Sequence, residues 1–135
     1  MSGDQIARAA LALTGVRFRL HGRDPISGLD CLGLVGCALK AAGLRPVLPR
    51  SSALRQRIGV ERYFHFASDS GLAEIKGPVL AGDIILFALT GAQHHLAVAT
   101  GLDGIVHAHA GLRRVVYGPP GSDWRILRVW RSTNS

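Results

Sequence analysis

The chain has little of what marks a disulfide-stabilised or membrane-spanning protein. Two of its 135 residues are cysteine, and these, Cys31 and Cys37, lie six positions apart. Six residues make about 1.7 turns of the helix predicted there, so the two side chains point to different faces and cannot form a disulfide. No apolar run reaches the roughly 18 residues that a membrane span needs. We therefore expect two free thiols and no transmembrane helix.

Lysine and aromatic residues are scarce, whereas arginine is abundant. The formal net charge is +7, 14 of the 16 basic residues are arginine, and aromatic residues make up 6% of the chain. The arginines are scattered, with only Arg113 and Arg114 adjacent, and no aromatic stacking platform accompanies them. This pattern favours a solvated basic surface over a nucleic-acid interface.

A signal-peptide pattern is also lacking. Asp4 occupies the region where positive charge is expected, and Arg8 interrupts the apolar stretch before a hydrophobic region can form. We expect synthesis in the cytoplasm, with another carrier needed for any action outside the cell. The length and the 47% hydrophobic content fit a single domain over residues 1–135.

Two helices are predicted in the first third of the chain. Residues 2–14 have an apolar stripe at helical spacing, a capping-box pair in Ser2 and Gln5, and a terminating glycine at Gly15. Residues 16–30 form a predicted loop. A second helix follows the N-cap Asp30 and ends at Gly43, and it is apolar on nearly every side, which places it centrally. Short helices are also predicted at 51–57 and 60–68.

Short β-prone runs dominate from residue 82 onward. Turn signals separate them at 102–104 and 110–111, and a loop is expected at 118–122. Helices followed by an antiparallel meander define an α+β domain. The predicted strands are residues 84–89, 96–100, 105–110, 114–117 and 126–130.

The position of Cys31 predicts a reactive thiol. A cysteine in the first helical turn lies at the positive end of the helix dipole, beside unpaired backbone N–H groups, and both favour the thiolate. Cys37 is predicted mid-helix among apolar neighbours and is interpreted as a core residue.

Two histidines could serve such a nucleophile. His95 opens one predicted strand and His107 lies in the next, so a hairpin turning near Asp103 would place them roughly opposite each other. We predict that His95 is the base for Cys31 and that His107 holds the ring of His95.

Four short motifs, in matching order, resemble those of the NlpC cysteine peptidases. The run Gly-Leu-Asp-Cys-Leu-Gly-Leu-Val at 28–35 is similar to the start of the nucleophile helix in that family, and Gly-Asp-Ile-Ile-Leu-Phe at 82–87 to its Gly-Asp-Leu-Val-Phe-Phe strand. His-Leu-Ala-Val at 95–98 resembles His-Val-Gly-Ile, and Ile-Val-His-Ala at 105–108 resembles Phe-Ile-His-Ala. Together they span about residues 13–117.

The resemblance implies a papain-like fold, with the nucleophile helix packed on a five-stranded, mostly antiparallel sheet. It implies a triad of Cys31, His95 and His107 that cleaves peptidoglycan stem peptides, usually at the γ-D-glutamyl–diaminopimelate bond, with no cofactor. Asp30 matches the residue that helps to bind the free amine of the stem.

Two positions depart from the family pattern on the amine-binding side. Phe18 stands where the family has a tyrosine, and Leu32 stands where a serine usually follows the cysteine. The pattern around Cys31 resembles the NlpC-type peptidases of phage tails and gene transfer agents. Proteins of such particles are therefore expected partners, and a phage-like particle is the expected carrier to the cell wall.

Two alternatives remain open from the sequence. His107 and His109 project to the same face of one strand and could bind zinc with His94, His95 or Cys31, giving a zinc hydrolase. Alternatively, the domain could recognise the cell wall or a particle protein without cutting. Otherwise, His94 and His109 are interpreted as cleft or surface residues.

Overall fold

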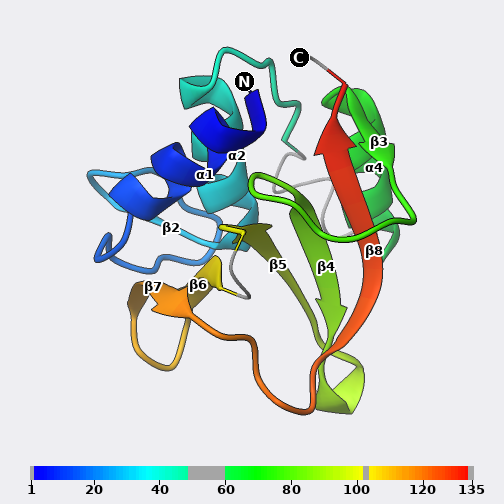
Figure 1. Cartoon of the computed structure of the whole chain (residues 1–135). Coiled ribbons are helices and arrows are strands. Elements are labelled where there is room, and N and C mark those ends of the chain that lie inside the picture. The colour runs from blue at the N-terminus through cyan, green and yellow to red at the C-terminus, as the bar shows by residue number, and fades with distance from the viewer. Residues whose placement is uncertain (1, 49–59, 102–103, 134–135) are drawn as a thin grey trace.

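Two N-terminal helices pack against each other on one face of an antiparallel sheet (Figure 1). This computed structural model describes residues 2–48, 60–101 and 104–133. Helix α1 spans Ser2–Ala12, α2 spans Cys31–Ala41 and α4 spans Glu61–Asp69. Helix α2 contacts α1 on one side and strands β5 and β6 on the other, which makes it the central helix of the domain.

The main sheet has six strands rather than the five predicted. Its order is β3-β8-β4-β5-β6-β7, and every neighbouring pair is antiparallel. The unpredicted strand is β3, which has only three residues, without apolar alternation, and pairs with the C-terminal end of β8. Its partner lies far along the chain, so no local pattern reveals it. The strands are β3 (Leu72–Glu74), β4 (Ile84–Ala88), β5 (His94–Ala99), β6 (Ile105–His109), β7 (Arg114–Gly118) and β8 (Arg125–Ser132).

Helix α2 begins and ends where its capping residues predict. Asp30 has extended backbone angles, and its Oδ1 accepts a hydrogen bond from the Gly33 N–H at 2.9 Å. At the other end Gly43 adopts a φ of 89°, and the Leu44 N–H donates to the Leu39 carbonyl at 3.0 Å. This Schellman arrangement satisfies the last carbonyls of the helix.

Two glycines of the predicted motifs are required by close backbone approaches. A Cβ on Gly33 would lie 2.0 Å from the Gly22 carbonyl oxygen, so the absent side chain lets the preceding loop reach α2. Gly82 has a φ of 88°, and a Cβ there would lie 2.1 Å from the Gly3 carbonyl oxygen in α1.

The two faces of the sheet carry separate apolar clusters. The larger cluster joins α1, α2 and α4 to side chains such as Leu86, Leu96 and Val106. The smaller cluster lies on the opposite face and includes Ile85 and Phe87. Strand alternation therefore assigns consecutive residues to opposite faces.

The remaining predictions have mixed outcomes. Helix α1 ends at Ala12 rather than Thr14 because residues 13 and 14 form tighter i→i−3 bonds. The helix predicted at 60–68 is confirmed as α4, whereas the one predicted at 51–57 and most of the 102–104 turn lie outside the described residues. The predicted 16–30 loop contains a small hairpin of β1 (Arg23–Asp24) and β2 (Gly28–Leu29). None of the described helices is long and apolar enough to cross a membrane.

Candidate active site

Cys31 is the first residue of α2, directly after the N-cap Asp30. It is half-buried, and its thiol interacts with the Tyr63 hydroxyl from α4 and the backbone N–H of Leu96 in β5. Both cysteines are free thiols, as predicted. The N-capped helix thus carries the Cys31 sulfur to the start of the strand that bears His95.

The environment of Cys31 opposes the predicted thiolate. Burial, followed by the Asp30 carboxylate, raises the pKa of the thiol above its usual value of 9.0. The Leu96 N–H, the Tyr63 hydroxyl and the Arg62 guanidinium lower this pKa only in part. The prediction of a lowered pKa was wrong because desolvation outweighs the stabilisation expected at a helix start.

His95 and His107 form a hydrogen-bonded pair. Nε2 of His95 lies 2.8 Å from Nδ1 of His107, and the two rings meet edge to face with centroids 4.9 Å apart. Burial is the largest cause that lowers the pKa of each ring to about 4. Electrostatic repulsion from His107 and His109 lowers the pKa of His95 further, and repulsion from His109 lowers that of His107. Both rings are therefore neutral at pH 7, as is the Cys31 thiol, whose pKa is raised.

The pair arises from a diagonal contact rather than from the predicted opposite positions. Val98 is the Cα partner of Val106, and Ala99 is the partner of Ile105. Continued along the strands, this register would place residue 97, not His95, opposite His107. A diagonal cross-strand distance is within reach of two aromatic rings, so the hydrogen bond forms despite the error in register.

Trp124 holds both rings of the pair from the β7–β8 loop. Its ring centroid lies 5.3 Å from that of His95 and 5.3 Å from that of His107, each edge to face, and 5.2 Å from that of Phe87. Trp124 connects the histidine pair to the smaller apolar cluster and contributes to the burial that keeps both rings neutral.

A cleft of about 210 Å³ opens beside the histidine pair. His109, two residues after His107 on the same face of β6, forms part of its wall and lies with its ring centroid 5.7 Å from that of His107. The cleft therefore joins three histidines to an aromatic side chain. Its lining residues are Leu89, Gln93, His95, His107, His109, Ala110, Gly111 and Trp124.

His94 occupies the other face of β5. Alternation along the strand places it with Leu96 and Val98, on the side that faces α2, whereas His95 lies on the side of the smaller cluster. The His94 ring centroid is 6.3 Å from that of Tyr63, whose hydroxyl interacts with Cys31. The two adjacent histidines therefore lie on different faces of β5, and His94 is the one on the side of Tyr63.

Asp30, the predicted amine-binding residue, already accepts three hydrogen bonds from its own chain. Its carboxylate accepts the Gly33 N–H, the His21 backbone N–H at 2.9 Å and the Arg23 Nη1 at 2.7 Å. It is 8% exposed. These three partners cap α2 and hold the preceding loop, so the local geometry gives Asp30 a structural role first.

The other two predicted binding residues contribute to the core. Leu32 is 3% exposed and belongs to the larger cluster, and Phe18 is half-buried against the same cluster. A Leu32→Ser change would remove a buried side chain, which typically costs about 2–5 kcal/mol in stability. Burial of Leu32 therefore does not support a role in substrate binding.

Cys37 is less enclosed than predicted. It is half-buried, its Sγ donates to the Arg23 carbonyl at 3.6 Å, and it lines a surface cavity of about 610 Å³ between α1, α2 and β1. Its pKa is raised, first by burial and then by Asp24. Cys37 lies six residues along α2 from Cys31, on a different face of the helix, and it does not line the cleft beside the histidine pair.

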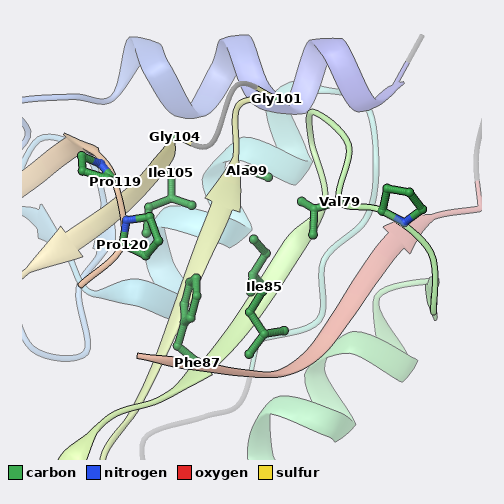
Figure 2. Close-up of a pocket in the computed structure, with 11 residues that line it drawn as sticks. Val79, Ile85, Phe87, Ala99, Gly101, Gly104, Ile105, Pro119 and Pro120 are labelled. Atoms are coloured by element: carbon green, nitrogen blue, oxygen red, sulfur yellow. The ribbon is translucent and has the colours of Figure 1, made fainter. Parts of the chain in front are cut away.

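The other features of the described residues offer no competing chemical centre. Within the described residues, no group of three His, Cys, Asp or Glu side chains could hold a metal ion, so the zinc alternative lacks structural support. A cavity of about 510 Å³ lies over β4 and β5 on the side of the smaller cluster (Figure 2). Pro119, Pro120 and Phe87 stand around it, and none of its lining side chains titrates.

Comparison with solved structures shows the same fold. NlpC2 from Trichomonas vaginalis superposes with a TM-score of 0.68 over 97% of this chain, at 19% identity. The peptidoglycan hydrolase RipB from Mycobacterium tuberculosis gives 0.62 over 96%, at 21% identity and covering 64% of RipB. RipD from the same organism, a non-catalytic NlpC/P60 domain protein adapted to peptidoglycan binding, gives 0.58 over 97% of each chain, at 22% identity.

These likenesses show that the chain has the papain-like α+β fold of NlpC/P60 domains. The chain spans 47% of the length of NlpC2. No family model and no curated protein matches the sequence.

Sequence reasoning missed Tyr63 and Trp124. Tyr63 lies in a short amphipathic helix, where an aromatic residue ordinarily indicates core packing. Trp124 follows a Gly-Ser-Asp turn, and a large aromatic residue in such a loop was the available signal. Tyr63 reaches Cys31, and Trp124 reaches the histidine pair, only because the fold packs distant segments together.

Proposed function

We propose that this chain is a cysteine peptidase that hydrolyses peptidoglycan stem peptides, with Cys31 as nucleophile, His95 as base and His107 as the orienting residue. The observation that carries the proposal is the His95–His107 hydrogen bond, at the start of the strand whose Leu96 N–H interacts with the Cys31 thiol. The shared fold with the hydrolase RipB supports the substrate class.

Thiol and imidazole are both neutral at rest, so proton transfer from the thiol and attack by the sulfur occur together in the first step. With His95 Nε2–H donating to His107 Nδ1, the free Nδ1 of His95 takes the thiol proton as sulfur bonds to the scissile carbonyl carbon. The carbonyl oxygen becomes an oxyanion, and the Cys31 backbone N–H at the helix start is its donor. His95 then returns the proton to the departing amine, and water releases the acyl group.

The scissile bond in this proposal is the γ-D-glutamyl–diaminopimelate bond. Delivery by a phage-like particle, with its tail proteins as partners, is the accompanying proposal for how the peptidase reaches the wall. The scissile bond follows from the motif resemblance at residues 28–35, 82–87, 95–98 and 105–108, and the carrier from the Asp-Cys-Leu-Gly-Leu-Val pattern at 30–35 alone.

Digestion of purified muropeptides, with mass-spectrometric assignment of the products, tests the reaction. We expect Cys31→Ala to lower kcat by at least about 1,000-fold. The Cys37→Ala control should keep parental activity because Cys37 lies away from the cleft. Retained hydrolysis in Cys31→Ala would end the proposal, as would products cut at a sugar linkage.

A second candidate is a non-catalytic peptidoglycan-binding domain. The raised thiol pKa and the lowered histidine pKa values favour an unreactive resting pair, and RipD provides a non-catalytic example of the fold. If the parent chain pellets with sacculi but releases no peptide at any pH between 5 and 9, this candidate replaces the peptidase.

A further inference from the structure

Two arginines face each other at the outer edge of the sheet, next to the cleft. The segment before β1 pairs with β7 through an isolated bridge between Arg17 and Arg114. The bonds on either side run from the Val115 N–H to the Val16 carbonyl and from the Phe18 N–H to the Arg113 carbonyl. Arg17 and Arg114 are thus a non-hydrogen-bonded antiparallel pair, the arrangement in which facing side chains approach most closely.

Both guanidinium groups point away from the core. Val16 and Phe18 pack on the larger cluster and Val115 is fully buried, so alternation turns Arg17 and Arg114 to the opposite side, where both are exposed. Like charges directly opposite each other destabilise a sheet. Such a pair gains stability when an anion lies between the two groups.

No described carboxylate supplies that anion. The arginines that form ion pairs in the described part of the chain are Arg23, Arg128 and Arg131, all on other elements. The sheet edge at Arg17 and Arg114 therefore has a positive potential, which attracts an anionic ligand.

His109 extends this pair into the cleft. It is the Cα partner of Arg114 across β6 and β7, so the two side chains share one face. The Leu112 N–H donates to His109 Nδ1 at 3.0 Å, so Nδ1 is an acceptor and the ring hydrogen lies on Nε2. The His109 Nε2–H is thus a hydrogen-bond donor in the cleft wall, on the same face of the sheet as the two arginines.

We propose that Arg17, Arg114 and His109, the basic row, bind the carboxylate groups of a peptide that occupies the cleft. The row selects free carboxylates over carboxamides. Only the identity of the peptide rests on the proposed function; the recognition of carboxylate rests on the row itself.

Calorimetric titration of the Cys31→Ala protein measures this binding without turnover. The probes are a stem tetrapeptide with free carboxylates and the same peptide with those groups amidated. The variant Arg17→Gln/Arg114→Gln loses two exposed charged contacts, so it should bind the carboxylate peptide about 10-fold more weakly than the parent does. Its Kd for the amidated peptide should be unchanged. Arg8→Gln/Arg45→Gln, which removes the same charge from exposed sites elsewhere, is the control and should bind as the parent does.

Three results would overturn the proposal: equal affinity for the two peptides, an equal loss in the Arg8/Arg45 control, or tighter binding of short duplex DNA than of the carboxylate peptide. The last would assign the row to polyanions in general. A parent chain that binds the carboxylate peptide through the row but does not hydrolyse it would refute the proposed peptidase and leave this proposal standing.

Discussion

His95 and His107 share one hydrogen bond, 2.8 Å long, between Nε2 of the first ring and Nδ1 of the second. Only one proton can lie between these atoms, so the bond fixes the tautomers of both neutral rings together. His107 accepts this proton if His95 Nδ1 is to act as a base toward Cys31. The pair is a single chemical unit: a proton taken at His95 Nδ1 leaves this hydrogen bond in place, whereas protonation of both rings would break it.

The buried pair predicts a loss of stability in mild acid. The pKa of each ring is about 4 in the folded chain and about 6.5 when unfolded, so between these values the unfolded state binds more protons. Stability is complete above pH 6.5 and falls as pH drops toward 4. Urea unfolding should show a decrease on the order of 3 kcal/mol between pH 7 and 4.5. His65→Gln, at an exposed site, should not alter this dependence, whereas His95→Gln should reduce it.

The three neighbouring histidines should differ in their importance for hydrolysis. His95→Ala should remove activity because the base is lost, while His107→Gln should keep part of it because an amide oxygen can still accept from His95 Nε2. His94→Ala should retain most activity in a muropeptide assay. Inactivity of His94→Ala with an active His95→Ala would reassign the base to the face of β5 that meets Tyr63.

Trp124 should act as a positioning residue for the histidine pair. Removing the indole in Trp124→Ala hydrates both rings, so their pKa values should rise from about 4 toward 6.5. Trp124→Phe restores an aromatic contact and should keep them low. Histidine NMR titration measures this without reference to activity. Unchanged pKa values in Trp124→Ala would mean that the loop packs beside the rings without desolvating them.

The Asp83–Arg131 pair should be the ionic interaction most important for stability. Asp83 is 1% exposed, and its carboxylate accepts Nε and Nη2 of Arg131, each at 2.8 Å, and the Leu80 N–H at 2.8 Å. Asp83→Asn leaves the guanidinium imperfectly paired and should cost about 3 kcal/mol in the free energy of unfolding. Glu74→Gln, which affects the solvent-accessible pairs of Glu74 with Lys76 and Arg128, should cost less than about 1 kcal/mol. Equal losses in the two variants would contradict this ranking.

Local sequence determined the central helix and most of the sheet. Asp30 and Gly43 define the ends of α2 because N-capping and left-handed termination depend on the residue itself and its immediate neighbours. The short β-prone runs over 84–89 and 96–100 likewise predict strands, and the structure buries every residue of β4 and the last four residues of β5. Cys31, His95 and His107 could be selected from the sequence for the same reason, because each opens or lies within an element that has a strong local signal.

Only the tertiary structure decided the chemical state of those residues. A helix start lowers a cysteine pKa in isolation, yet burial against Tyr63 and β5 raises that of Cys31, and no local pattern records how much protein surrounds a sulfur atom. The diagonal contact of His95 with His107, the closure of the site by Trp124 and the facing of Arg17 with Arg114 join segments separated by 12 to 97 positions. Such contacts depend on strand register and packing, which the whole chain sets together.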